Sequence, residues 1–224
     1  DTSADNVLVN STKKYYVNFG LEIYLDDKLI LRHDMNLSGK KVLIKYPVGT
    51  LGDIIAWFPY AQAFKYRHDC EVYCAMAPEI ADLFRPAYPE LNFIGPDERP
   101  PEIYASYYMG IFFPCDDRVH QPVDWRIVGL QKTIPYLLGL PAEELRPRIL
   151  PHNLERTIAE PYVCIATQST SQAKYWNNGS GWLEVIKHLK SKGYRVLCID
   201  RENCHGAGSR WNTIPHGAED FTGT

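Results

Sequence analysis

The chain has 224 residues, 45% of them hydrophobic, and its 24 lysines and arginines against 27 aspartates and glutamates give a net charge of −3. This composition is that of a globular protein with one large or two small domains, and it offers no broad basic surface for a nucleic-acid backbone. No apolar run approaches the roughly 20 residues that a membrane-spanning helix needs, so we expect neither a nucleic-acid partner nor a membrane span.

Residues 1–40 differ from the rest and predict a small β module. Apolar and polar residues alternate over residues 17–23, and the turn-forming run DDK separates them from the apolar run LILRH. Alternation on both sides of a turn is typical of an antiparallel hairpin.

Residues 41–150 predict an α/β domain with a parallel sheet. Short continuous apolar runs (VLIKYP, EVYCAMA, LNFIG and SYYMGIFF) are separated by helical stretches, as expected of strands buried on both faces. One helix is expected from Asp53 to about residue 68, with Pro59 kinking it or lying in its first turns.

A proline-rich and charged connection over residues 141–161 separates this domain from a second one, which we place at residues 151–224. Strand YVCIATQ, a polar loop, amphipathic helix SGWLEVIKHLKSKG with Gly193 as its C-terminal cap, and strand YRVLCID form a β-loop-α-β unit. Two parallel strands cannot cover themselves, so we expect the chain to be a fragment of a longer polypeptide with an incomplete C-terminal domain.

The six cysteines predict buried thiols rather than a metal site. None forms a C-x-x-C pair, and several lie in apolar strand-like runs, where free cysteine behaves as a small hydrophobic residue. The six are Cys70, Cys74, Cys115, Cys164, Cys198 and Cys204.

The loop PVGTLGD joins the first predicted parallel strand to its helix. Gly49 and Gly52 suit a tight turn, and Asp53 begins the helix, where a carboxylate is favoured by the backbone dipole. Asp53 is therefore either a simple helix cap or a functional carboxylate at the edge of the sheet. The missing G-x-G-x-x-G pattern argues against a dinucleotide cofactor.

The loop STSQAKYWNN is a candidate anion site. Ser169 and Thr170 offer hydroxyls, Lys174 offers a positive charge, and the helix starting near Ser180 offers backbone N–H groups, a combination that suits a diphosphate. A solvated polar loop is the alternative. After the next strand, Asp200 or Glu202 stands where a ribose hydroxyl could bind.

These residues carry a resemblance. The segments GTLGDIIAWFP, ATQSTSQAKYWNN, GYRVLCIDRE and IPHGAEDFTG, in this order, resemble the bacterial autotransporter heptosyltransferases, within glycosyltransferase family 9. The stretch VHQPVDWRIVGLQ and the N-terminal β module are typical of the autotransporter group, and the resemblance runs from the hairpin to the last residue.

The resemblance implies a GT-B architecture of two Rossmann-like domains and an inverting transfer of heptose from ADP-heptose to serine or threonine hydroxyls of an autotransporter adhesin passenger. Position in the motifs implies that Asp53 is the catalytic base and that Ser169, Thr170 and Lys174 bind the donor phosphates. The nucleoside is assigned to Glu202, with Glu219 as its rival.

The resemblance also implies a cytoplasmic bacterial enzyme that forms large homo-oligomers, described as dodecamers, with the N-terminal β module contributing to assembly and acceptor recognition. No cofactor or metal is expected for catalysis. A structural iron is implied, but none of the six cysteines matches its ligands, which would lie outside this chain.

Two alternatives remain open. A lipopolysaccharide core heptosyltransferase would use the same donor and base with a lipid-linked sugar acceptor, although such enzymes open almost directly with the LGD turn. A non-catalytic nucleotide-sugar or adhesin-binding module would use Asp53 only as a helix cap.

Overall fold

The computed structural model describes residues 11–47, 51–112, 118–150, 153, 155–169, 171–207 and 210–223. For Gln172 and for residues 205–207 and 210–212, it describes the backbone only. The chain divides into two compact units, Asp1–His152 and Asn153–Thr224, which are described separately below.

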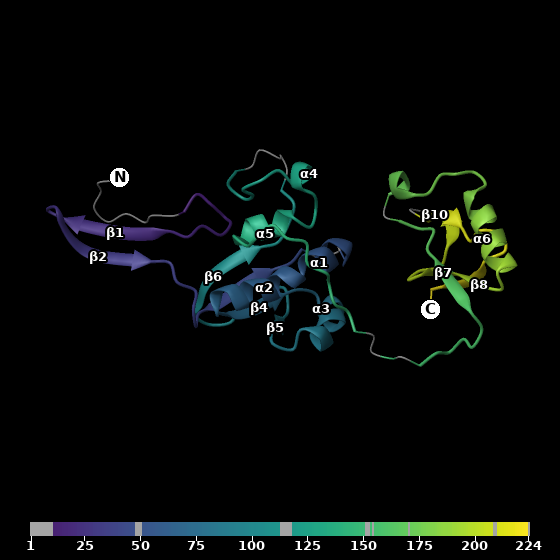
Figure 1. Cartoon of the computed structure of the whole chain (residues 1–224), viewed down its shortest axis with the longest axis horizontal. Helices are drawn as coiled ribbons and strands as arrows, with labels where there is room; N and C mark the ends of the chain where they lie inside the picture. Colours follow the sequence, from purple (N-terminus) through teal and green to yellow (C-terminus); the bar gives the residue numbers. More distant parts are fainter. Residues whose placement is uncertain are drawn as a thin grey trace. The chain divides into compact units, whose positions relative to one another are not determined.

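An antiparallel hairpin opens the first unit, as the alternation predicts. Strand β1 (Gly20–Leu25) pairs with β2 (Lys28–Asp34) across a turn at Asp26 and Asp27, both of which adopt positive φ. Every residue of both strands is exposed, and the hairpin projects from the rest of the unit (Figure 1). Its apolar side chains therefore lack a covering layer among the described residues.

A four-stranded parallel sheet forms the centre of the unit, which confirms the predicted sheet. The strands are β3 (Lys41–Lys45), β4 (Glu71–Ala75), β5 (Asn92–Ile94) and β6 (Ile103–Tyr108), in the order β5-β4-β3-β6. The chain builds outward from β3 through β4 and β5, then crosses back to place β6 on the other side of β3. The carboxyl ends of β3 and β6 therefore flank the switch point of the sheet.

Two helices separated at Pro59 replace the single helix expected after β3. Helix α1 (Leu51–Trp57) is followed by α2 (Pro59–His68), with Pro59 in the first turn of α2, where its missing N–H costs no hydrogen bond. The side chains of Trp57 and Tyr60 bond to the carbonyls of Leu130 and Glu143, at 3.0 and 2.7 Å.

Aromatic packing holds these helices on the sheet. The Phe58 ring is fully buried, stacks on Phe84 at 4.1 Å between ring centroids, and meets the edge of Tyr88 at 4.8 Å. Phe84 ends helix α3 (Pro78–Phe84), which is followed by a 3-10 turn, η1 (Arg85–Ala87). The helical stretch predicted between β4 and β5 is therefore present as α3 and η1, each with proline in its first turn.

The last strand of the sheet differs from its prediction. The apolar run SYYMGIFF predicts a strand at residues 106–113, but β6 ends at Tyr108. Two short helices follow, α4 (Trp125–Val128) and α5 (Thr133–Leu138), and α5 buries Ile134 and Leu137 in the core of the unit.

The second unit contains a three-stranded parallel sheet. Strands β7 (Tyr162–Ile165), β8 (Arg195–Asp200) and β11 (Glu219–Thr222) lie in the order β11-β8-β7. Only two strands were expected in this sheet, and β11 is missed because its run EDFT is short and polar. Between β7 and α6 lies a 3-10 turn, η2 (Gln172–Lys174), and strands β9 (His205–Ala207) and β10 (Arg210–Thr213) form a small antiparallel pair.

Helix α6 (Gly181–Ser191) covers one face of this sheet, as its amphipathic pattern predicts. Ile186 packs against Ile165, Val196 and Cys198, with Trp182 and Leu189 at the margin. Gly193 follows the helix at φ +84°, a left-handed conformation that confirms its predicted role as a cap.

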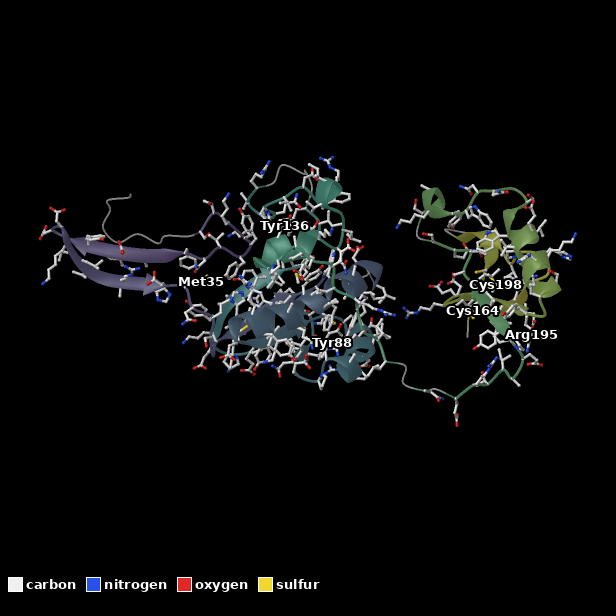
Figure 2. All side chains as sticks on the ribbon, viewed as in Figure 1. Met35, Tyr88, Tyr136, Cys164, Arg195 and Cys198 are labelled. Atoms are coloured by element: carbon white, nitrogen blue, oxygen red, sulfur yellow. The ribbon has the colours of Figure 1, made fainter. Side chains whose placement is uncertain are left out.

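The cysteines agree only partly with the prediction of buried thiols. Cys70, Cys74, Cys198 and Cys204 are buried, and burial raises the pKa of Cys70 to about 11. Cys164 is exposed, because it lies on the face of β7 opposite to the one that α6 covers, whereas Cys198 on neighbouring β8 lies beneath α6 (Figure 2). Cys115 is outside the described residues.

No helix in the described part of the chain is both long and apolar enough to cross a membrane.

Candidate functional site

Asp53 lies in the first turn of α1, just beyond the carboxyl end of the central strand β3. Its side chain is partly buried, and the next residue, Ile54, anchors the helix in the core. This position is beside the switch point between β3 and β6, where open α/β sheets bind their ligands. Asp53 therefore occupies a place suited to contact with a substrate.

No hydrogen bond among the described residues supports the interpretation of Asp53 as a helix cap. Within the described ranges, the Asp53 carboxylate has no hydrogen-bond or ion-pair partner. A capping carboxylate would accept a bond from a backbone N–H of the first turn. The carboxylate is thus available to an external donor.

The structure describes one of the two glycines before Asp53. Gly52 lies inside α1 without positive φ, and a Cβ added there would meet nothing within 4 Å. Its helical position gives no conformational reason for glycine, although the open space leaves room for a ligand near the backbone. Gly49 lies outside the described residues.

In the second unit, the predicted anion loop follows β7. Ser169 is partly buried and its carbonyl accepts a bond from the Tyr175 hydroxyl at 3.3 Å, while Lys174 is exposed at the end of η2. Thr170 lies outside the described residues. The loop therefore presents a hydroxyl and an ammonium group ahead of the α6 N-terminus at Ser180.

Trp176 closes the loop onto helix α6. Its ring meets Trp182 at 5.1 Å in an edge-to-face arrangement, and a Cβ on Gly181 would come within 2.6 Å of it. Gly181 thus permits the close approach of the indole. Trp176 remains 47% exposed.

Glu202 lies on the neighbouring loop, after β8, and is exposed. The turn is held by a bond from the Glu202 N–H to the Asp200 carboxylate at 3.2 Å, and by one from the Cys204 N–H to the Thr222 hydroxyl at 3.2 Å. Strands β7 and β8 are parallel neighbours, so this loop and the loop after β7 leave the sheet at the same edge. Ser169, Lys174 and Glu202 consequently lie on loops at the same carboxyl edge.

Glu219 lies at the opposite edge of the same sheet. It is the first residue of β11, and its carboxylate pairs with Arg195, the first residue of β8, at 3.0 Å from Nε. Arg195 also reaches Glu160 at 3.3 Å. The hydrogen bonds from Arg195 lower the pKa of Glu219. Glu219 is therefore a partner of Arg195, remote from the edge that carries Glu202.

Comparison with known proteins was made at the levels of sequence and structure. No protein-family model matches the chain. The chain is 51% identical to BAHTCr, an autotransporter heptosyltransferase of Citrobacter rodentium, over 98% of the chain and 54% of that protein. It is 47% identical to the autotransporter heptosyltransferase TibC of Escherichia coli O78:H11, over 100% of the chain and 57% of TibC.

The crystal structure of TibC, described as an iron-containing dodecameric glycosyltransferase from enterotoxigenic E. coli H10407, matches with a TM-score of 0.88 and 49% identity, over 96% of this chain and 56% of TibC. The chain belongs to the autotransporter heptosyltransferase family. A second TibC structure, in complex with ADP-D-β-D-heptose, matches with the same TM-score of 0.88 and 48% identity, over 96% of this chain and 57% of that one.

The chain spans about half the length of the heptosyltransferases it matches, 54% of BAHTCr and 57% of TibC. One member of the family, BimC of Burkholderia thailandensis, carries the name inactive autotransporter heptosyltransferase and is 36% identical over 86% of this chain and 46% of that protein. Membership of the family therefore does not by itself establish activity.

The ion pair of Glu219 with Arg195 predicts a pH-dependent contribution to stability. Because the folded-state pKa of Glu219 lies below its ordinary value of 4.5, the contribution is present above that pH and is lost as the pH falls through the folded pKa. Glu219→Gln should lower the thermal midpoint by about 1 to 3 °C at pH 7, since exposed ion pairs are weak, and the difference should shrink as the pH falls through the folded-state pKa.

Calorimetry between pH 3 and pH 7 measures this difference. Glu155→Gln is the matched control, because Glu155 is exposed and its carboxylate has no ion-pair partner among the described residues. A Glu219→Gln variant as stable as wild type at pH 7 would contradict the structural role of Glu219.

Proposed function

We propose that the protein to which this chain belongs is an inverting heptosyltransferase of glycosyltransferase family 9, which moves heptose from ADP-heptose to serine or threonine hydroxyls of an autotransporter adhesin passenger. The names of BAHTCr and TibC, and the ADP-heptose bound to TibC, support the donor and the acceptor class. The observation that carries the proposal in this chain is Asp53, a carboxylate at the switch point of a parallel sheet that has no partner among the described residues.

In this proposal the architecture is GT-B. Residues 41–150 form the Rossmann-like domain that carries the base, residues 151–224 form part of the donor-binding domain, and residues 1–40 form an added β module. Two compact units, each built on a parallel sheet, are consistent with such an arrangement.

Donor binding falls to the second unit. Ser169, Thr170 and Lys174 would bind the diphosphate ahead of helix α6, where hydroxyls, an ammonium group and backbone N–H groups can share the negative charge. We assign the nucleoside to Glu202 rather than Glu219. Glu202 shares the carboxyl edge with the phosphate loop, whereas Glu219 is engaged by Arg195 at the amino edge.

Asp53 would act as the general base. A serine hydroxyl is a weak nucleophile at neutral pH, so a carboxylate within hydrogen-bond reach must take its proton as the oxygen attacks the anomeric carbon. The bond from the anomeric carbon to the β-phosphate oxygen breaks in the same step, and ADP leaves with the bonding electrons. Displacement from the face opposite to ADP inverts the anomeric centre.

Stabilisation of the leaving ADP by Lys174, the loop hydroxyls and the α6 N-terminus would make a catalytic metal unnecessary. TibC is described as iron-containing. Among the described residues, no group of three or more His, Cys, Asp or Glu side chains could hold a metal ion. In this proposal the ligands of a structural iron lie in the part of the protein that this chain does not span, as the resemblance implies.

The proposed setting is a homo-oligomer in the bacterial cytoplasm, dodecameric as TibC is described. The exposed apolar side chains of the β1–β2 hairpin support a role of the β module in assembly and acceptor recognition. Ile23 and Leu31 face each other across the hairpin and are 40% and 48% exposed.

The second candidate is a non-catalytic binding module, which the naming of BimC as inactive favours. It would keep the fold and the β module while Asp53 performs no chemistry. A lipopolysaccharide core heptosyltransferase is a weaker alternative, because BAHTCr and TibC, 51% and 47% identical to the chain over the aligned residues, are named for autotransporters.

Substitution of Asp53 separates these functions. With full-length protein, ADP-heptose and a purified autotransporter passenger, intact mass should record the addition of one or more heptose units by wild type. Asp53→Asn keeps the size and removes the base, so the transfer rate should fall on the order of 10²- to 10⁴-fold while donor binding persists.

Asp82→Asn is the matched control, since Asp82 lies on the exposed face of α3 and forms an exposed ion pair with Arg85. Transfer by Asp53→Asn at the wild-type rate would remove Asp53 as the base. Wild type that modifies a lipopolysaccharide core and not the passenger would move the acceptor to the alternative enzyme, and wild type that modifies neither would favour the binding module.

Ile23→Glu tests the proposed assembly. In the proposed oligomer this side chain is buried against another copy, where an unpaired carboxylate is costly. The substitution should therefore reduce the mass of the full-length oligomer at least twofold. Light scattering gives the mass, and Leu183→Glu on exposed helix α6 is the control. An unchanged mass for Ile23→Glu would exclude the hairpin from assembly.

A further inference from the structure

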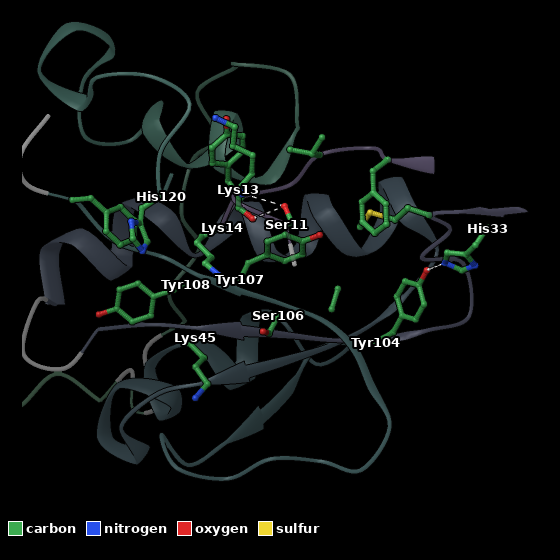
Figure 3. Close-up of a pocket in the computed structure, with 16 residues that line it drawn as sticks. Ser11, Lys13, Lys14, His33, Lys45, Tyr104, Ser106, Tyr107, Tyr108 and His120 are labelled. Carbon is green, nitrogen blue, oxygen red and sulfur yellow. Dashed lines mark hydrogen bonds between the residues drawn. The ribbon is translucent and has the colours of Figure 1, made fainter. Parts of the chain in front are cut away.

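A groove of about 640 Å³ runs beside strand β6 in the first unit. One wall is β6, the other is the extended segment that precedes the hairpin, and β2 closes one end. In Figure 3, the hydrogen bond between the His33 ring and the Tyr104 hydroxyl, 2.9 Å long, marks the end near the hairpin, and His120 lies at the other end. One of its walls belongs to the β module, for which acceptor recognition is proposed above.

Strand β6 is an edge strand whose outer side is unpaired. On its inner side the Met109 N–H donates to the Lys45 carbonyl at 2.8 Å, so alternation along a parallel pair turns the backbone groups of Ser106 and Tyr108 outward. Among the described residues no backbone hydrogen bond satisfies those outward groups. An unpaired edge of this kind can accept another strand.

The opposite wall is fixed in place. The N–H groups of Lys14 and Tyr16 donate to the carbonyls of Val119 and Leu137, at 2.7 and 2.8 Å, and the Tyr16 ring packs against Phe64 at 6.1 Å. Because successive side chains of an extended segment alternate, Tyr15 and Val17 face away from that contact and line the groove. The groove therefore has two anchored walls.

Positive charge is concentrated in the groove. Lys13, Lys14 and Lys45 line it, and none of the described residues that line it is an aspartate or a glutamate. Within the part of the chain described, none of the three has a carboxylate within ion-pair distance, and the Lys13 ammonium group donates to the Arg118 carbonyl and lies over the Tyr15 ring. The chain as a whole has a net charge of −3, so this cluster is a local feature that complements an anionic partner.

We propose that this groove binds the acceptor polypeptide as an extended, acidic segment that adds a strand to β6. The backbone groups of Ser106 and Tyr108 would supply main-chain hydrogen bonds, and the lysines would select acidic side chains beside the modified hydroxyl. A second copy of the same edge is a poor occupant, because it would bring two lysine clusters together. The inference rests on the proposed function, since it names how that acceptor is bound.

The position of the groove suits delivery of a hydroxyl to Asp53. Lys45 is paired in register with Tyr108, so the groove reaches the carboxyl edge of both strands at the switch point. The chain leaving β3 at this edge leads within eight residues to Asp53. An acceptor strand running along β6 toward this edge would carry its next residues toward the base.

Charge reversal at Lys14 tests the proposal in full-length protein with ADP-heptose and a purified passenger. Lys14→Glu should raise KM for the passenger about tenfold and leave kcat and donor binding unchanged, whereas Lys14→Arg should behave as wild type. Lys187→Glu makes the same charge change on exposed helix α6 and should have no effect. Hydrogen exchange of the same protein reports strand addition directly: the amides of Ser106 and Tyr108 should exchange fast alone and slowly with passenger bound.

The outcomes are separable. Wild type that transfers heptose while Lys14→Glu keeps the wild-type KM overturns the groove and spares the proposed function. If Lys14→Glu changes the oligomer mass and leaves KM unchanged, the groove is a contact between copies. If the Ser106 and Tyr108 amides are protected before passenger is added, the edge is already covered. Either result overturns the proposal. Wild type that transfers nothing to the passenger removes the proposed function and this inference with it.

Discussion

The pairing of β3 on both sides is the constraint on which the candidate site depends. Hydrogen bonds to β4 on one side and to β6 on the other fix β3 in the interior of the sheet. The chain therefore leaves β3 where the order of the strands reverses. The buried Phe58, stacked on Phe84, then holds the helices that carry Asp53 against the sheet. Asp53 is thereby placed at an edge that the fold itself leaves open to a ligand.

In the second unit, the direction of the strands likewise places the loops that we propose to bind the donor. Parallel strands bring the loops after β7 and β8 to one edge, where Ser169, Lys174 and Glu202 lie, and send the first residues of the strands to the other. Arg195 and Glu219 pair at that other edge, and the pair ties β8 to β11. Glu202 and Glu219 are rival candidates in the sequence. They lie at opposite edges of the sheet, because Glu202 follows a strand and Glu219 begins one.

Much of this architecture is readable in the sequence, and the exceptions have physical reasons. Alternation predicts the hairpin, continuous apolar runs predict β3 and β4, and the 3, 4, 7 spacing predicts α6. Strand β11 escapes because half of its residues are acidic, and β6 is misplaced because its apolar run continues past Tyr108. The motif singles out Asp53 from the sequence alone. Contacts between residues far apart in the chain decide the rest: whether Asp53 has a partner among the described residues, at which edge of the sheet Glu219 lies, and where the lysine-lined groove forms.

The measurement that tests the central claim most directly is a structure of the full-length protein with ADP-heptose and a passenger peptide that carries the acceptor serine. The account predicts the serine hydroxyl within about 2.6–3.2 Å of the Asp53 carboxylate, facing the anomeric carbon on the side opposite to ADP. A serine hydroxyl bonded to a different base, with Asp53 turned away from the acceptor, would contradict it.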